Sequence, residues 1–220
     1  MEEKEARLNP FHRIYHRLLD YYGHQDWWPG ETPFEVMVGA ILTQNTAWTN
    51  VEKAINNLKR ANSLSADQIM AISVEELADL IRSAGYFNVK ARRLKNFCDW
   101  YLFQGGYEQL AKWSTDALRK SLLSVNGIGP ETADDILLYV FERPIFVIDA
   151  YTRRLFLRLG LIEPDLGYEE LRRIFESELE KNTQLYNEYH ALIVNHAKSF
   201  CKTRPVCETC ILNDHCPGKE

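Results

Sequence analysis

The chain has 220 residues, 45% of them hydrophobic, and a formal net charge of -5 at pH 7. A chain of this length and composition buries a full core without disulfides, as one domain or as two closely packed lobes. No run approaches the about 18 to 20 continuous apolar residues of a membrane span, and the first ten residues lack the apolar core of a signal peptide. We therefore predict a monomeric cytoplasmic protein with no membrane partner.

The acidic balance argues weakly against nucleic acid as a partner, because nucleic-acid-binding domains commonly carry a basic surface. The distribution of charge matters more than its sum, and the basic residues gather in three places. Any one such cluster is by default a solvated helix face. The clusters consist of Lys90, Arg92, Arg93 and Lys95; of Arg153, Arg154 and Arg158; and of Lys198, Lys202 and Arg204.

Apolar residues recur at helical spacing along almost the whole chain, which predicts an all-α protein. Thr32 is expected to cap a helix, with Glu35 three residues later, and Ser73 with Glu76 repeats this capping-box pattern. The segment from residue 34 to residue 42 is apolar on almost every face. It is therefore expected to form a central, buried helix.

The predicted helices divide into two lobes. A compact lobe is expected from residue 31 to residue 142, and it includes a helical hairpin at about residues 116–141. Residues 1–30 together with 143–220 are expected to form the second lobe. One β-like run, PIFVI at residues 144–148, is too short and isolated to define a sheet.

The predicted hairpin contains the sequence NGIGP, with apolar stripes of helical spacing on both sides. Gly127 and Gly129 permit backbone angles that are closed to other residues, and Pro130 suits the first turn of a helix. Backbone N–H groups at such a helix start bind a DNA phosphate without any lysine. An ordinary helix-turn-helix corner is the alternative interpretation of the same pattern.

The stretch LLSVNGIGPETADDILLYVFERPIFVIDAYTRRLFLRLG resembles the helix-hairpin-helix and following segment of the endonuclease III superfamily of DNA glycosylases. The motif ILTQNT and the cysteines at the end of the chain match the same family, so the resemblance covers most of the sequence. It implies a two-lobed all-α helix-hairpin-helix glycosylase fold with a DNA-binding cleft between the lobes. It also implies double-stranded DNA with a damaged base as the partner, and hence association with the nucleoid.

By the same resemblance, Asp149 is the catalytic carboxylate. Taken alone, an Asp between PIFVI and a helical stretch is simply a helix N-cap. A carboxylate at a helix N-terminus stays ionised at neutral pH, because the helix dipole favours the charged form. Cleavage of an N-glycosidic bond develops positive charge on the sugar, and a fixed carboxylate stabilises that charge or orients a water molecule.

The target base must leave the duplex to reach Asp149. The resemblance implies that Gln44 fills the vacated stack; the alternative is a polar residue that closes a buried helix. Lys198 is either near the base pocket or a solvated cation. The aromatic and proline residues expected to line the pocket, which taken alone would more often be core residues, are Trp27, Trp28, Pro29 and Trp48.

Within the superfamily, the motifs WWP, ILTQNT and NGIG with the Glu that follows look most like those of the 3-methyladenine DNA glycosylases. An aromatic pocket suits a cationic alkylated purine through stacking and cation–π attraction. We therefore expect a glycosylase that hydrolyses the N-glycosidic bond of a flipped, alkylated purine in base excision repair. The alternatives are a glycosylase for mismatched or oxidised bases, because pocket residues decide the substrate, and a noncatalytic DNA-binding module.

Family members that also cut the DNA strand have a lysine at the second position after the GIG motif, where it forms a Schiff base. Glu131 occupies that position here, and a carboxylate cannot form an imine. The resemblance therefore implies an enzyme that leaves an abasic site without strand cleavage. Lys120 and Lys198 are the substitutes to consider, although neither matches the lysine position.

Four cysteines close to the end of the chain form the pattern C-x5-C-x2-C-x5-C, a strong metal-site signal. The spacing alone leaves zinc as a rival, although zinc sites more often show two tight pairs. The resemblance implies a [4Fe-4S] cluster, even though the first interval is one residue shorter than is usual in the family. Lys202 and Arg204 within that interval are expected to contact DNA phosphates. The predicted ligands are Cys201, Cys207, Cys210 and Cys216.

Overall fold

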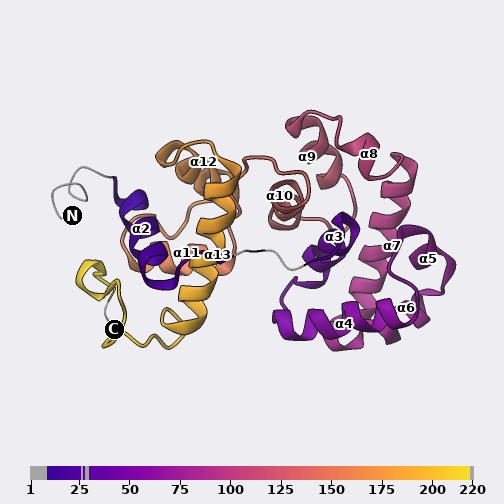
Figure 1. Ribbon diagram of the computed structural model, residues 1–220, viewed down its shortest axis with the longest axis horizontal. Helices are drawn as coiled ribbons and strands as arrows, with labels where there is room; N and C mark the ends of the chain where they lie inside the picture. The colour runs from indigo at the N-terminus through magenta and orange to yellow at the C-terminus, as the bar shows by residue number, and fades with distance from the viewer. Residues whose placement is uncertain (1–8, 26, 28–29, 219–220) are drawn as a thin grey trace. The chain divides into compact units, whose positions relative to one another are not determined.

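The computed structural model describes residues 9–25, 27 and 30–218 of the chain. All regular structure in these residues is helical, which confirms the predicted all-α class (Figure 1). None of the described helices is long and apolar enough to cross a membrane. The α-helices are α2 (Pro10–Tyr22), α3 (Pro33–Leu42), α4 (Trp48–Arg60), α5 (Ala66–Ala71), α6 (Val74–Leu80), α7 (Phe87–Phe103), α8 (Tyr107–Leu110), α9 (Thr115–Leu123), α10 (Pro130–Tyr139), α11 (Ala150–Arg158), α12 (Tyr168–Glu178) and α13 (Thr183–Ser199), and the 3-10 helices are η1 (Arg82–Ala84) and η2 (Asn213–His215).

The chain divides into two compact units, one formed by Met1–Trp27 with Pro144–Glu220 and the other by Trp28–Arg143. In the first unit, α2 and α11 both pack against α13. The rings of Phe11, Phe156 and Phe175 contact one another, with centroid distances of 5.1 Å, 4.5 Å and 5.0 Å. Aromatic burial thus joins the N-terminal helix to the C-terminal part of the chain.

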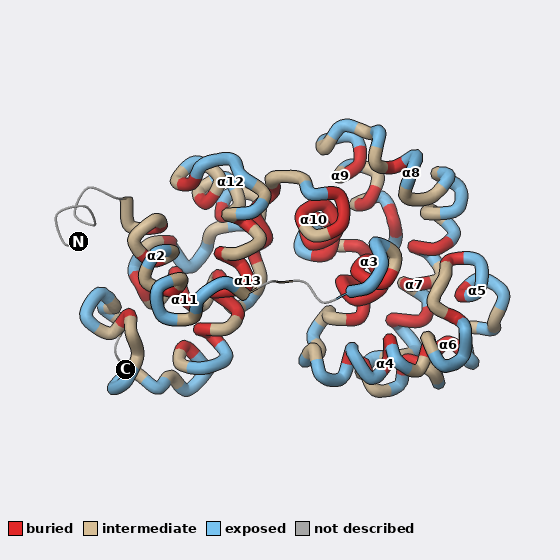
Figure 2. Tube along the Cα trace, in the orientation of Figure 1, coloured by how far each residue is buried: buried red, intermediate tan, exposed pale blue. Residues whose placement is uncertain are grey.

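Helix α3 is the centre of the second unit, where it packs against α4, α7 and α10. Every residue from Glu35 to Leu42 is buried, as predicted for this apolar segment (Figure 2). The side chain of Thr32 accepts a hydrogen bond from the backbone N–H of Glu35, and Ser73 and Glu76 form a reciprocal capping box. Both predicted helix starts are therefore confirmed.

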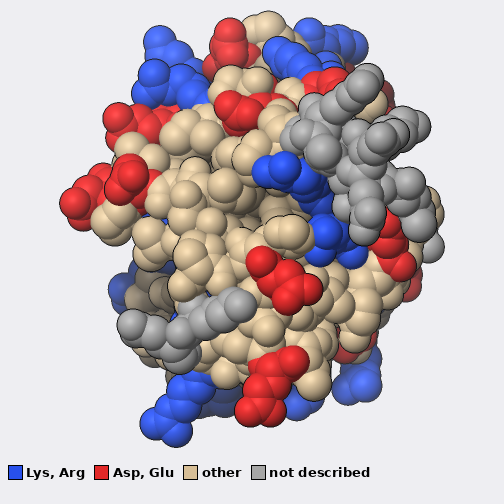
Figure 3. Space-filling view, turned by 90° about the vertical axis from the view of Figure 1, so that its left-hand side faces the viewer, with Lys and Arg blue, Asp and Glu red and all other residues tan. Residues whose placement is uncertain are grey.

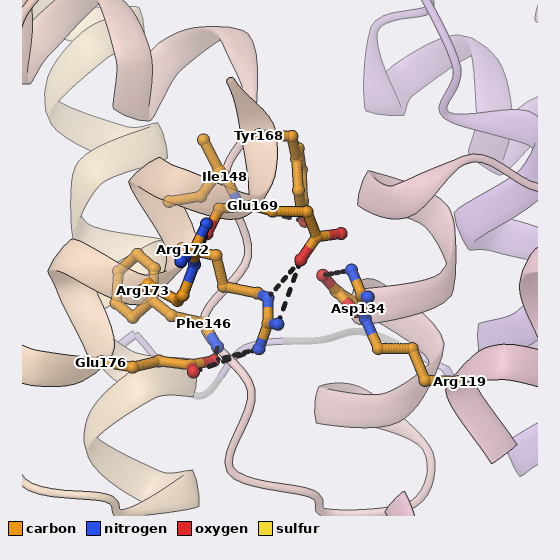
Figure 4. Close-up of polar contacts among 9 residues, drawn as sticks. All are labelled: Arg119, Asp134, Phe146, Ile148, Tyr168, Glu169, Arg172, Arg173 and Glu176. Atoms are coloured by element: carbon orange, nitrogen blue, oxygen red, sulfur yellow. Dashed lines mark hydrogen bonds and ion pairs between the residues drawn. The ribbon is translucent and has the colours of Figure 1, made fainter. Parts of the chain in front are cut away.

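The run from Pro144 to Ile148 has no regular secondary structure and pairs with no strand among the described residues. Its backbone instead bonds to side chains of α12. The N–H of Phe146 donates to Glu176 Oε1 (3.1 Å), and the N–H of Ile148 donates to the hydroxyl of Tyr168 (3.4 Å; Figure 4). These contacts fix the segment that leads directly into Asp149.

Lys90 does not lie on a solvated helix face, as was expected for its basic cluster, because the residue is only 1% exposed. Its ammonium donates to the carbonyls of Leu42 (2.7 Å) and Ala84 (2.7 Å) and to the hydroxyl of Thr46 (2.6 Å). Burial lowers the pKa of Lys90 to about 8, and the nearby charge of Arg93 adds to the effect. Lys90 therefore holds the end of α3 and the turn that carries Gln44.

Candidate active site

Asp149 is the N-cap of α11, and its Oδ1 accepts a hydrogen bond from the backbone N–H of Thr152 (2.7 Å). The other oxygen, Oδ2, lies 3.5 Å from Nε2 of His190 on α13. The Asp149 side chain is 12% exposed, so it remains accessible, whereas the His190 side chain is 5% exposed. The sequence predicted the capping position but gave no sign of the histidine.

The carboxylate of Asp149 is stabilised in its charged form. Burial alone raises its pKa, but the contact with His190, the charge of that ring and the two donors of Thr152 outweigh burial, so the pKa lies below its ordinary value. A buried carboxylate with such partners is a frequent feature of functional sites. Asp149 is therefore ionised at neutral pH with one edge open.

Lys198 lies beside two aromatic rings of the same unit. Its ammonium is 5.7 Å from the ring centroid of Trp27 and 5.9 Å from that of Tyr151, distances within the range of cation–π contacts. Desolvation lowers the pKa of Lys198, and the opposite charge of Asp149 partly offsets this. The structure thus brings together Asp149, Trp27 and Lys198, three of the residues singled out in the sequence, and adds Tyr151.

The other predicted pocket residues are outside the described residues or belong to the second unit. Trp28 and Pro29 lie outside the described residues. Trp48 is the first residue of α4, which belongs to the second unit, and it is half-buried.

The two glycines of the turn between α9 and α10 differ in backbone conformation and in surroundings. Gly127 has φ +99°, and a Cβ on it would lie within 3.0 Å of three side-chain carbons of Arg93. Gly129 has φ -91° and open space around it, so the expectation that it needs a glycine-only conformation is wrong. Pro130 begins α10, as expected.

Gln44 is bound to this turn. Its amide Nε2 donates to the carbonyl of Gly127 (3.1 Å) and to the hydroxyl of Thr132 (2.9 Å), while Arg93 donates to its Oε1. Gln44 thus connects the end of α3 with the hairpin. This position agrees with the alternative interpretation of Gln44 as a polar residue that closes a buried helix. A swing of its amide away from these partners is required for any insertion into DNA.

The acidic residues that follow the glycine turn have different environments. Asp134 is fully buried and forms a bidentate ion pair with Arg119 of α9, at 2.6 Å and 3.0 Å (Figure 4). This pair joins the two helices of the hairpin and removes one acid from the protein surface. Glu131, in the first turn of α10, is exposed, as is Lys120 near the end of α9.

The four C-terminal cysteines line one pocket, together with Arg158 and His196. All four are free thiols. Burial raises the pKa of the Cys210 thiol, and the proximity of the other three cysteines raises it further. Among the described residues, no three His, Cys, Asp or Glu side chains form a group that could hold a single metal ion. The thiols therefore face a common space without closing on one ion.

Two basic side chains contact these thiols. Arg158 Nη1 lies 3.3 Å from Cys201 Sγ and also donates to the carbonyl of Lys202 (2.6 Å). His196 Nε2 lies 3.5 Å from Cys210 Sγ. Arg158 thus ties the start of the cysteine loop to α11.

Lys202 and Arg204 are both exposed in this loop. On the side of the molecule that carries α2 and the C-terminal segment, basic and acidic side chains are interspersed (Figure 3). No single charge sign dominates that face.

Residues 38–181 match the family model described as HhH-GPD superfamily base excision DNA repair protein. The chain belongs to the HhH-GPD superfamily. A protein of Methanocaldococcus jannaschii, provisionally named a DNA repair glycosylase, is 50% identical over 98% of this chain and 100% of its own length. Endonuclease III of Sulfolobus acidocaldarius is 30% identical over 83% of this chain and 81% of its own. The HhH-GPD assignment makes the chain a DNA glycosylase of base excision repair.

Solved structures of glycosylases agree with this assignment. The 3-methyladenine DNA glycosylase of H. pylori, bound to 1,N6-ethenoadenine, has a TM-score of 0.75 and 32% identity, and the match covers 87% of this chain and 98% of that one. A noncovalent complex of endonuclease III with DNA has a TM-score of 0.82 at 21% identity, covering 96% and 97%. The helix-hairpin-helix glycosylase fold predicted from the resemblance is therefore confirmed.

Several residues of the site were missed by the sequence reasoning. Tyr151, two residues after Asp149, was not singled out, and His190 sits in the apolar run HALIV, which is typical of core. Arg93 was assigned to a basic cluster, although it contacts Gln44 across 49 residues of sequence. Only Tyr151 carried a usable signal, because an aromatic residue beside a helix-capping Asp lies near that carboxylate.

Proposed function

We propose that this HhH-GPD protein is a monofunctional glycosylase for alkylated purines, with Asp149 as its catalytic carboxylate. The observation that carries the proposal is the ionised, partly accessible Asp149 at the start of α11, in the same unit as Trp27, Tyr151 and Lys198. Loss of a purine leaves positive charge on the sugar, and a fixed negative charge in a poorly solvated site stabilises it strongly. Asp149 then holds the water that completes hydrolysis.

The similarity to the H. pylori 3-methyladenine DNA glycosylase supports an alkylated purine as the substrate. Trp27 offers a broad ring for stacking against a flipped base, and stacking on an aromatic side chain contributes about 1 to 3 kcal/mol per base. We include Trp28, Pro29 and Trp48 in the proposed pocket on the strength of the sequence motif alone. Gln44 is proposed to fill the gap that the flipped base leaves.

Lys198 favours a second candidate, a glycosylase for neutral mismatched or oxidised bases. A positive charge beside Trp27 repels a cationic base. The similarity to the H. pylori 3-methyladenine DNA glycosylase keeps the alkylated purine as the first candidate.

Replacing Lys198 tests its effect on base selection. Lys198→Met is expected to increase the release of cationic 7-methylguanine relative to neutral 1,N6-ethenoadenine by about three- to tenfold, because like-charge repulsion of about 1 kcal/mol is removed. Lys202→Met removes the same charge from the cysteine loop and should slow both reactions equally. An unchanged ratio in Lys198→Met would mean that this ammonium does not face the base.

Release of free base from defined duplexes tests the proposed function. The panel contains duplexes with 1,N6-ethenoadenine, alkylated purines, uracil opposite guanine, and 8-oxoguanine. We expect the alkylated substrates to react fastest. Faster release of uracil or 8-oxoguanine would establish the second candidate instead, and release from none of them would contradict both.

We propose that strand cleavage is absent because Glu131 replaces the amine needed for a Schiff base. Lys198 is the strongest candidate for a substitute Schiff-base lysine, because its pKa is lowered and the charge of Asp149 acts on it. Borohydride reduction traps an imine between a lysine and the sugar, so a trapped complex would refute the monofunctional assignment.

We propose that Cys201, Cys207, Cys210 and Cys216 hold an iron-sulfur cluster. The four thiols line one pocket, and their sequence pattern lacks the two tight pairs that are more usual for zinc. When bound, the cluster would shape the loop that carries Lys202 and Arg204, which we propose contact DNA phosphates along with the backbone of the Gly127–Gly129 turn. DNA affinity should then fall with added salt.

The metal content of the purified protein distinguishes an iron-sulfur cluster from a zinc ion at the four cysteines. We expect the purified protein to be brown and to contain about four iron atoms per chain. Cys210→Ala should lose the iron, whereas Cys98→Ala, which changes a buried thiol in the other unit, should retain it. A colourless protein with one zinc ion would overturn the cluster assignment.

A further inference from the structure

The Asp149 carboxylate has one oxygen fixed by its own helix and one that is not. Oδ1 accepts the N–H of Thr152 at 2.7 Å, which is the ordinary capping bond. A single hydrogen bond to Oδ1 does not fix the carboxylate plane, because combined changes in the two side-chain torsion angles pivot the group about that contact and redirect Oδ2. The direction of Oδ2 therefore depends on what lies on the other side, and that side is occupied by His190 of α13.

The other charged and titratable groups near Asp149 are engaged elsewhere or act from a distance. Arg153 donates to the carbonyl of Leu166 (2.7 Å), and Arg154 donates to that of Cys201 (2.8 Å). The Tyr168 hydroxyl of α12 accepts from Ile148, and Lys198 of α13 interacts with Asp149 through its charge. His190 Nε2, 3.5 Å away, thus faces Oδ2 directly.

We propose that His190 is a positioning residue that fixes the orientation and charge of the Asp149 carboxylate, an inference that rests on the proposed role of Asp149. The Nε2–Oδ2 distance of 3.5 Å is longer than a direct hydrogen bond and within the range of an ion pair. Contacts of catalytic groups are often long in the free enzyme and tighten when substrate binds. Helix α13 holds the ring in place, because His190 is buried there between Tyr189 and Ala191, which are buried as well.

The charge balance at Asp149 agrees with this role. Burial favours the protonated carboxyl, and His190 is the largest of the influences that oppose it. Removal of the ring nitrogen leaves the two Thr152 donors to act against burial. The acidic limit of activity should then move to higher pH, since the carboxylate is the active form and is lost as pH falls through its pKa.

The test compares His190→Phe, His190→Gln and Tyr189→Phe. The phenylalanine keeps the ring shape without a donor, and the glutamine keeps an N–H donor. Tyr189→Phe is the matched control, because it removes a buried hydrogen bond of the neighbouring residue to the carbonyl of Phe11. Single-turnover base release from a 1,N6-ethenoadenine duplex is measured from about pH 8 to pH 5, with each variant expressed as a ratio to wild type so that titration of the base cancels.

We expect His190→Phe to release base about 100-fold more slowly than wild type, with a ratio that falls further as pH decreases. His190→Gln should recover most of the rate, and Tyr189→Phe should match wild type at every pH. The proposal is overturned if His190→Phe retains the wild-type rate, or if glutamine is no better than phenylalanine and neither ratio depends on pH. If His190→Phe does not fold, His190→Leu takes its place as the variant without a donor: a wild-type rate in it, or a loss that glutamine shares equally and that does not depend on pH, overturns the proposal.

Asp149→Asn separates this inference from the proposed function. If wild type releases no base, or if Asp149→Asn releases it normally, the proposed function fails. If wild type is active and Asp149→Asn is inactive while both His190 variants match wild type, the inference about His190 alone fails.

Discussion

Asp149→Asn is expected to lower the rate of base release by about 10²- to 10³-fold, the loss found when one preorganised charged or polar group is removed from a transition state. Asparagine caps a helix as well as aspartate does, so α11 should form and the protein should remain folded. Its amide carries no charge, however, and cannot stabilise positive charge on the sugar. Single-turnover base release, together with thermal unfolding, measures the two effects separately.

Asn182→Asp is the matched control for this change. Asn182 caps α13 in the same unit, and its side chain accepts a hydrogen bond from the N–H of Leu185 (3.0 Å). Asn182→Asp therefore exchanges the same two residue types at another helix N-terminus. The control should keep the wild-type rate. An Asp149→Asn variant that is as active as the control would mean that Asp149 is only a helix cap.

Gly127→Ala is expected to weaken DNA binding and to destabilise the second unit. A residue with a side chain at φ +99° costs about 1 to 3 kcal/mol, and its Cβ would push against the Arg93 side chain. Displacement of Arg93 also removes its hydrogen bond to Gln44. We expect a DNA affinity lower by about tenfold or more, measured by fluorescence anisotropy with a lesion-containing duplex.

Gly129→Ala provides the comparison two residues away. Gly129 has φ -91°, and a Cβ there meets no atom within 4 Å. Its variant should unfold as wild type does and should lose clearly less DNA affinity than Gly127→Ala, because the added Cβ displaces no protein atom. Equal losses in the two variants would show that the turn responds to any added methyl group at its surface and not to the conformation of Gly127.

The features that depend on residues close together in the chain were predicted correctly from the sequence. The cap at Thr32 and the capping box of Ser73 with Glu76 each depend on residues three apart, and the structure has both. The buried helix α3 followed from a run that is apolar on every face. The glycine turn was predicted in place but not in detail, because two glycines in one motif look alike until their dihedral angles are known.

The contacts that depend on tertiary packing could not be predicted in this way. Lys90 appeared to be part of a basic surface, yet packing of α3 and η1 around α7 buries it against three oxygen acceptors. His190 meets Asp149 only because α13 packs against α11. Neither contact depends on residues close together in the sequence, so no local sequence pattern predicts it.

Two of the acids in this acidic chain are neutralised by ion pairs within the protein. Asp134 is fully buried and neutralised by Arg119, and Glu35 is buried and paired with Lys59 (2.9 Å). Those carboxylates contribute little to the field at the surface, because a close opposite charge cancels theirs at a distance. Each pair removes one positive charge together with one negative charge, so the net charge stays at -5 and only its distribution changes.

The most direct test of the central claim is a single-turnover reaction of the wild-type protein with a duplex that contains one 1,N6-ethenoadenine, followed by separate assays for free base and for strand breaks. The proposed function predicts that free base appears while the strand remains intact until it is treated with alkali, and that borohydride traps no protein on the DNA. Failure to release the base, or strand cleavage with a trapped covalent complex, would contradict it.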